Sequence, residues 1–253
     1  MKKTLVTAHS GCEGTPRDSM ESIERALEFG ADVIEMDIRR ASDGRLYISH
    51  DRLPDEESVN KNSLEDVFRR IQNTHLCINC DIKEPFAICD TMALAKKFGL
   101  GPDRLFLTGA VLPELIAIEP SITENATVFV NIEEALKPFS MREFFADKTE
   151  ELFPELANDP KAYVMEMMLD EDCVKAVIKM VKSMGLDGIN MPHKVYTPAT
   201  AAIYAANGIR ASVWTPNEPD DVNRCLALGA YNITTRSPST VTECRRKFEQ
   251  EHQ

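Results

Sequence analysis

Two carboxylates stand two residues apart in the apolar segment Ala31–Asp37, which ends in Glu35-Met36-Asp37. Alternate side chains of a β-strand point to the same face, so Glu35 and Asp37 lie on one side of the strand, roughly 6–7 Å apart along the chain. Two acids on one face of a buried strand repel each other and resist burial unless a cation lies between them. Oxygen ligands of this kind suit Mg²⁺ or Ca²⁺. The spacing therefore predicts a binding site for one divalent cation.

A histidine or an acid also ends three other predicted strands, at His9, His50 and Asp81. Two imidazoles beside a set of carboxylates are typical of metal-assisted acid–base chemistry. One such residue alone is more often a hydrogen-bonding or turn residue, so it is the convergence of several strand ends that favours a functional site. Lys83, two positions beyond Asp81, is either a solvated charge or a cation that binds a substrate anion beside the acids.

The elements that must position these residues follow a regular pattern, in which short β-rich runs alternate with amphipathic helical runs. Strands are predicted at Leu5–Ala8, Val33–Ile38, Leu46–Ser49, Leu76–Ile82, Leu105–Leu107, Thr127–Ile132, Gly188–Met191, Ala211–Trp214 and Tyr231–Thr234. Helices are predicted at Ser19–Phe29, Ser63–Ile71, Asp90–Phe98, Glu134–Phe145, Asp172–Met184, Thr197–Asn207 and Asp220–Leu228. This alternation over 253 residues predicts an α/β fold and favours a closed (β/α)8 TIM barrel over an open sheet. In such a barrel the carboxyl ends of the strands gather at one mouth.

Two regions interrupt the alternation. Leu46–Ser49 is expected to pair back on Val33–Ile38 through the turn Ser42-Asp43-Gly44-Arg45. The stretch 133–160 is acidic and poorly periodic, which predicts an insertion, and Tyr163–Met168 is either a further strand or the start of the next helix. Since no linker or internal repeat divides the sequence, we expect residues 1–253 to form a single domain.

The composition is that of an ordinary globular protein, with 43% apolar and 28% charged residues and a formal net charge of −12. This charge disfavours nucleic acid or an anionic membrane as the main partner, although a local cationic cleft can still bind one phosphate. Because no stretch reaches the ~20 apolar residues of a membrane span and the first apolar run is too short for a signal peptide, we expect a soluble cytoplasmic protein without stable membrane association. The seven scattered cysteines suit free thiols in a reducing compartment, and Cys77-Ile78-Asn79-Cys80 lacks the second pair of a zinc site.

Several motifs, in order along nearly the whole chain, resemble those of the glycerophosphodiester phosphodiesterase family. Ala8-His9-Ser10-Gly11 is similar to the Ala-His-Arg-Gly with which the family opens, and Glu35-Met36-Asp37 is similar to its Glu-x-Asp. Its His-Asp pair, its Asn-x-Glu-x-Lys strand and its Val-Trp-Thr-x-Asn segment resemble His50-Asp51, Asn79-Cys80-Asp81-Ile82-Lys83 and Val213-Trp214-Thr215-Pro216-Asn217.

The resemblance implies a TIM barrel of the PLC-like phosphodiesterase type, an enzyme of lipid metabolism that hydrolyses a small glycerophosphodiester to glycerol 3-phosphate and an alcohol. It implies one Mg²⁺ or Ca²⁺ whose ligands are Glu35, Asp37 and Asp81. His9 and His50 would be the acid–base pair, with either residue in either role. Trp214 would line the mouth as an apolar wall for the alcohol, or else pack in the barrel core.

The chain departs from the family pattern at Asp81, where the family has glutamate, at Thr235, where it has aspartate, and at two positions near the phosphate. Ser10 stands where the family has a phosphate-binding arginine, and Arg17 stands where it has a glutamate. We expect Arg17 to take over the phosphate contact, with Lys83 as a second cation. The alternatives are a divergent phosphodiesterase acting on a lysophospholipid or a sugar-linked phosphodiester, a non-catalytic barrel that binds a phosphorylated ligand, and a metal-dependent lyase or other hydrolase on the same barrel.

Overall fold

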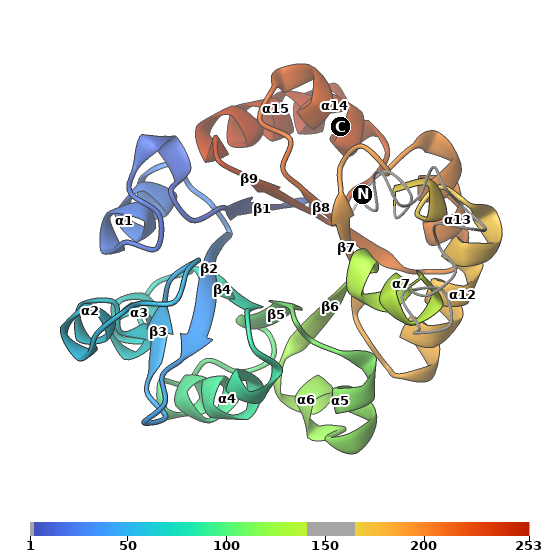
Figure 1. The fold of residues 1–253 in the computed structure, drawn as a ribbon. Helices are drawn as coiled ribbons and strands as arrows, with labels where there is room; N and C mark the ends of the chain where they lie inside the picture. Colours follow the sequence, from blue (N-terminus) through green and yellow to red (C-terminus); the bar gives the residue numbers. More distant parts are fainter. Residues whose placement is uncertain (1–2, 141–164, 253) are drawn as a thin grey trace.

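The structure is a computed structural model that describes residues 3–140 and 165–252, without the side chains of 137–140. In this part of the chain, nine strands form one sheet in the order β1-β9-β8-β7-β6-β5-β4-β2-β3 (Figure 1). The strands are β1 (Leu5–Ala8), β2 (Val33–Arg40), β3 (Leu46–Ile48), β4 (Cys77–Ile82), β5 (Leu105–Gly109), β6 (Thr127–Asn131), β7 (Gly188–Pro192), β8 (Arg210–Trp214) and β9 (Asn232–Thr235). Parallel pairing of β1 with both β2 and β9 closes the sheet, which confirms the predicted TIM barrel.

Helices surround this barrel on its outside (Figure 1). They are α1 (Met20–Glu28), α2 (Glu56–Lys61), α3 (Leu64–Ile71), α4 (Ile88–Lys97), α5 (Pro113–Ile118), α6 (Ser121–Asn125), α7 (Ile132–Ser140), α12 (Glu171–Ser183), α13 (Pro198–Ala206), α14 (Pro219–Ala227) and α15 (Pro238–Glu251), with the 3₁₀ turns η1 (Cys12–Gly14) and η2 (Pro85–Ala87). Four of these helices, α2, α5, α6 and α15, were not predicted from the sequence. Among the helices that the structure describes, none is both long enough and apolar enough to cross a membrane.

The two interruptions in the alternation have different outcomes. β3 pairs antiparallel with β2, with Ile48 opposite Ile38, so the predicted hairpin is confirmed. The first residues of the 133–160 stretch continue α7 as far as Ser140, and the rest of that stretch lies outside the described residues. Of the ambiguous run Tyr163–Met168, the described residues 165–167 are helical, which favours the helix over the strand.

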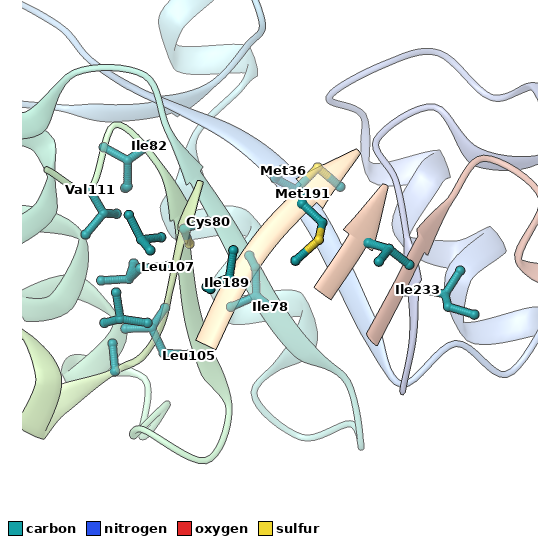
Figure 2. Close-up of a cluster of buried hydrophobic side chains, with 14 of the residues drawn as sticks. Met36, Ile78, Cys80, Ile82, Leu105, Leu107, Val111, Ile189, Met191 and Ile233 are labelled. Atoms are coloured by element: carbon teal, nitrogen blue, oxygen red, sulfur yellow. The ribbon is translucent and has the colours of Figure 1, made fainter. Parts of the chain in front are cut away.

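Alternation along the strands separates an apolar layer from a polar one. Met36, Ile78, Cys80, Ile189 and Ile233 belong to the buried apolar core between the sheet and the helices (Figure 2). The intervening residues of the same strands point into the barrel, where the acids lie. Apolar contacts thus hold the outer face of the strands against the helices, and the inner face carries the polar and acidic side chains of the cavity.

Aromatic rings fill the barrel toward the amino ends of its strands. The ring centroids of Phe106 and Phe129 are 6.3 Å apart, and Phe129 stacks on Tyr231 at 5.6 Å. Gly188 makes room for this packing, because a Cβ there would lie 2.6 Å from Cε1 of Phe129. The polar groups are therefore left at the opposite end of the barrel.

Candidate active site

A cavity of about 420 Å³ opens at the carboxyl ends of the strands. Its lining includes every residue that the sequence analysis proposed for the site, namely His9, Arg17, Glu35, Asp37, His50, Asp81, Lys83 and Trp214. These residues come from strands and loops spread over most of the chain, and the closed barrel brings their side chains to one place. The lining also includes polar residues that the sequence analysis did not single out, among them Thr108, Asn131, Asn190, Thr234 and Arg236.

Three carboxylates meet on one side of this cavity. Asp37 of β2 lies opposite Asp81 of β4 in the sheet register, and candidate ligand oxygens of Glu35, Asp37 and Asp81 all lie within 4.8 Å of one another. Glu35 is 5% exposed and Asp37 is 4% exposed. Burial, and then the charges of Asp37 and Asp81, raise the pKa of Glu35 well above its ordinary value. A divalent cation would relieve this repulsion, and the oxygen donor set fits Mg²⁺ or Ca²⁺.

Lys83 partly neutralises the three acids. Its Nζ lies 2.5 Å from Oδ1 of Asp37 and 2.5 Å from Oδ2 of Asp81. Burial alone would lower the pKa of Lys83, but the charges of Asp81 and Asp37 outweigh it and raise that pKa above its ordinary value. The lysine therefore stays protonated and brings one positive charge to a site with three carboxylates.

His9 directly follows β1 and its ring is held by the backbone. Nδ1 lies 2.8 Å from the carbonyl oxygen of Ser10, and because a carbonyl can only accept, Nδ1 carries the proton in this contact. Burial lowers the pKa of His9 below its ordinary value; the positive charges of Arg236 and Arg17 act in the same direction, against the Ser10 carbonyl and Asp37. The ring is thus suited to be neutral at pH 7, with Nε2 free to accept a proton.

His50 follows β3 and its backbone is fixed on both sides. Its N–H donates to Oδ2 of Asp18 at 2.9 Å, and its carbonyl oxygen accepts from Nε and Nη2 of Arg39 at 3.0 and 2.7 Å. The side chain itself is 55% exposed, and its Nδ1 lies 3.0 Å from Oδ1 of Asp51. Since a carboxylate accepts the Nδ1 proton, the Nε2 atom remains for exchange with a ligand.

Asp18 has a role that the sequence analysis did not find. The N-cap of α1 is Ser19, since its side chain accepts from the backbone N–H of Ser22. The buried Asp18 carboxylate instead accepts from the Ser10 hydroxyl at 2.9 Å and from the backbone N–H of Asp37 at 3.3 Å, in addition to His50. An aspartate beside a cap residue gives no sequence signal of such a contact.

Ser10, at the position of the family's arginine, supports the loop rather than the cavity. It is 1% exposed, its N–H donates to Oε2 of Glu35 at 3.1 Å, and its hydroxyl accepts from the N–H of Asp18 at 2.6 Å. Arg17 lines the cavity instead. The side chain of Arg17 runs close to Gly11, where a Cβ would lie 3.1 Å from the arginine Cγ.

A chain of hydrogen-bonded amides and hydroxyls runs from strand to strand inside the barrel and reaches the lining of the cavity at Asn190 and Asn131. It runs from Thr7 to Asn232 (2.7 Å), Ser212 (3.0 Å), Asn190 (2.9 Å) and Asn131 (2.9 Å), and so joins five strands. On the other side, the hydroxyl of Thr108 donates to Oδ1 of Asn79 at 3.1 Å. These mutual hydrogen bonds allow a polar layer to be buried inside the barrel.

Comparison with known proteins agrees with this geometry. The model of the glycerophosphoryl diester phosphodiesterase family matches residues 9–86, the segment that holds both histidines and the three carboxylates. A glycerophosphodiester phosphodiesterase of Caldanaerobacter subterraneus is 26% identical over 97% of this chain and 99% of its own length.

Solved structures of glycerophosphodiester phosphodiesterases share the fold. A glycerophosphodiester phosphodiesterase of Thermotoga maritima superposes with a TM-score of 0.67 at 17% identity, covering 96% of this chain and 99% of its own. A phosphodiesterase of Oleispira antarctica, solved in complex with the product sn-glycerol-3-phosphate, has a TM-score of 0.63 at 12% identity over 96% of both chains. The chain is thus similar to the glycerophosphoryl diester phosphodiesterase family in the motifs of residues 9–86, and to a glycerophosphodiester phosphodiesterase along nearly its whole length.

Proposed function

We propose that this chain hydrolyses a glycerophosphodiester to glycerol 3-phosphate and an alcohol by metal-dependent acid–base catalysis. The main support is one cavity in which His9 and His50 line the same space as three clustered carboxylates. The Caldanaerobacter relative is named for this activity, and the Oleispira structure contains glycerol 3-phosphate as product.

Glu35, Asp37 and Asp81 would hold one divalent cation, either Mg²⁺ or Ca²⁺. When bound, such a cation withdraws charge from the non-bridging oxygens of the phosphodiester. The Nζ of Lys83, which already lies between Asp37 and Asp81, would contact the same phosphoryl group as a second positive charge.

The ring contacts of the two histidines support different roles for them. His9 is suited to be the base, because Ser10 holds its Nδ1 proton and burial keeps the ring neutral. Its Nε2 removes the proton of the attacking hydroxyl as that oxygen bonds to phosphorus. His50, oriented by Asp51 and acting as an imidazolium, donates the proton of its Nε2 to the leaving alcohol oxygen as the phosphorus–oxygen bond breaks, and is left neutral. The attacking group is one of two. It is either the substrate's own glycerol hydroxyl, which gives a cyclic phosphate that water then opens, or a water molecule that attacks the phosphodiester directly.

Two further residues would orient the substrate. Arg17, whose guanidinium has no ion pair within the described parts of the chain, would bind a non-bridging oxygen in place of the arginine missing at Ser10. Trp214, at the end of β8, would form an apolar wall for the alcohol that is released.

A turnover assay with glycerophosphocholine and glycerophosphoethanolamine tests this proposal. We expect release of glycerol 3-phosphate that stops with EDTA and returns with added Mg²⁺ or Ca²⁺. His50→Ala should lower kcat by about 10²–10⁴-fold, the usual contribution of a general acid. His252→Ala, which changes an exposed histidine at the end of α15, is the matched control and should retain turnover.

Other outcomes would support the alternatives. Tight binding without turnover would identify a non-catalytic barrel, and turnover confined to a lysophospholipid or a sugar-linked phosphodiester would identify a divergent phosphodiesterase. Failure to bind or cleave any of these esters would leave the metal-dependent lyase or other hydrolase.

A further inference from the structure

Arg236 lines the cavity, but the proposed mechanism does not use it. It directly follows β9, and its backbone is held by two neighbouring loops. Its N–H donates to Oδ1 of Asn217 at 2.9 Å, and its carbonyl oxygen accepts from the N–H of Glu13 at 2.8 Å. The start of this side chain is therefore fixed at the rim of the cavity.

Within the described residues, the positive charge of Arg236 has no ion-pair partner in the protein. Within residues 3–140 and 165–252, its guanidinium makes no hydrogen bond or ion pair, and the same holds for Arg17. Lys83, by contrast, already forms ion pairs with two carboxylates. Both arginines lie close enough to His9 for their charges to lower its pKa, although burial is the larger cause. The cavity thus offers two available guanidinium groups near one proposed catalytic residue.

Arg236 follows β9, which β1 and β2 separate from β4 and β3 in the closed sheet. The sheet register places Trp214 of β8 beside Thr234 of β9, and Arg236 comes two residues after Thr234. Lys83 and His50 follow β4 and β3, on the other side of β1 in the strand order. The arginine is thus near the wall that Trp214 would form for the released alcohol, and farther around the barrel from Lys83 and His50.

We infer that Arg236 binds a second anionic group, a carboxylate or a phosphate carried by the alcohol half of the substrate. This inference rests on the proposed function and names its substrate class, glycerophosphodiesters whose released alcohol is itself an acid. A phosphodiester carries one negative charge, for which Arg17 and Lys83 already provide cations. Arg236 then remains for a further anion, and a guanidinium binds either a carboxylate or a phosphate through two parallel hydrogen bonds.

Two matched pairs of substrates test the inference. Glycerophosphoserine differs from glycerophosphoethanolamine by one carboxylate, and glycerophosphoglycerol phosphate differs from glycerophosphoglycerol by one phosphate. We expect kcat/KM to favour the more anionic member of at least one pair by about tenfold, which corresponds to 1.4 kcal/mol. The pair that shows the preference identifies the second anion as carboxylate or phosphate.

The variant Arg236→Gln should lower kcat/KM for the anionic member about tenfold more than for its partner, and Arg236→Lys should restore part of the preference. Arg246→Gln, on the exposed face of α15, removes a surface arginine and should leave the preference as in the wild type. Equal losses on both members of each pair, or no loss on any substrate, would overturn the inference.

Calorimetric binding in EDTA separates this inference from the proposed function. A carboxylate- or phosphate-dependent affinity that Arg236→Gln removes would support the second anion site even if the wild type with Mg²⁺ or Ca²⁺ cleaved none of the four esters, an outcome that would contradict the proposed function. Cleavage and binding of both members of each pair with equal efficiency would contradict the inference and leave the proposed function standing.

Discussion

The carboxylate of Asp18 accepts a hydrogen bond from the backbone N–H of His50, a residue 32 positions further along the chain, at 2.9 Å. The same carboxylate accepts from the hydroxyl of Ser10 and from the N–H of Asp37. One buried side chain therefore joins the loop after β1 to a proposed acid and to a proposed metal ligand. A rigid connection of this kind fixes reacting groups that an open loop would leave loose.

Asp18→Ala should lower kcat more than it raises KM, because His50 loses the acceptor that fixes its position. Three donors would lose their partner, so we also expect a loss of about 1–3 kcal/mol in the free energy of unfolding. Steady-state kinetics and urea denaturation measure the two effects. Asp18→Asn keeps one acceptor oxygen and should lie between the alanine variant and the wild type. Wild-type kcat in the alanine variant would contradict a positioning role.

Arg17→Ala should lower kcat/KM by about 10–10³-fold, because a guanidinium that binds the developing phosphoryl charge is lost. Kinetics with glycerophosphoethanolamine measure this effect. Arg25→Ala, which removes a surface arginine paired with Glu28 on α1, serves as the control. If Arg17→Ala has the activity and the substrate affinity of the wild type, the hypothesis that Arg17 makes the phosphate contact is wrong.

Glu35→Gln should have opposite effects on stability and activity. Without a metal, the variant removes repulsion among three clustered carboxylates, so its melting temperature should exceed that of the metal-free wild type. With Mg²⁺ or Ca²⁺, the increase in melting temperature should be smaller than in the wild type, and turnover should fall. Thermal denaturation with and without EDTA measures both changes, with Glu28→Gln on the exposed face of α1 as the control. Equal metal-induced increases in the two proteins would show that Glu35 is not a ligand.

Gly109→Ala should destabilise the fold and disturb Asp81. Gly109 has a φ of +78°, and a Cβ there would lie 2.2 Å from Oδ1 of Asp81 and 2.4 Å from the carbonyl oxygen of Ile82. The combined strain and overpacking should cost about 2–4 kcal/mol in urea denaturation, with weaker metal binding by calorimetry. Gly101→Ala is the matched control, because nothing lies within 4 Å of its Cβ position. Similar stabilities of the two variants would contradict the close approach.

Asp32→Asn should destabilise the protein at neutral pH but not at strongly acidic pH. Burial alone would raise the pKa of Asp32, but hydrogen bonds from the Val6 N–H, Arg245 and Lys3 outweigh it and hold that pKa below its ordinary value. A carboxylate with a lowered pKa stabilises the fold above its unfolded-state pKa of about 3.9, and this contribution disappears as the pH falls through the folded-state pKa.

Urea denaturation at pH 7 and at pH 3 tests this sign. The wild type should exceed the variant by about 1–3 kcal/mol at pH 7, and the difference should shrink at pH 3. Asp43→Asn, at an exposed turn, is the control for a carboxylate with little burial. A difference that stays constant or grows toward acid would contradict the assignment.

Much of the fold could be predicted because its strands are buried, apolar and regularly spaced. All nine predicted strands occur within a few residues of their predicted bounds. The missed helices carry weaker patterns. In α15 only a few apolar residues, such as Val241, Cys244 and Phe248, recur at helical spacing. The buried face also contains Arg245, which pairs with Asp32, and this charged residue interrupts the apolar pattern in the sequence. The short helices α5 and α6 contain too few turns to show a period.

The site could be predicted where function coincides with the end of a strand. That rule found His9, Asp37 and Asp81, and it applied equally to Arg236, which was overlooked because a lone arginine after a strand has no partner in the sequence. Asp18 could not be found in this way, since its three hydrogen bonds come from residues that only the folded barrel brings together. Contacts between distant loops depend on the tertiary structure and leave no local pattern.

The enclosed position of Ser10 limits how this chain can be converted to the arrangement of its relatives. A long cationic side chain at that place would remove the hydroxyl that bonds Asp18, and would press on the loop whose Ser10 N–H donates to Glu35. Restoring the family's arginine by one exchange would thus remove a structural contact before it supplied a useful charge. Grafting a different anion specificity onto this loop therefore requires exchanging Ser10 and Asp18 together.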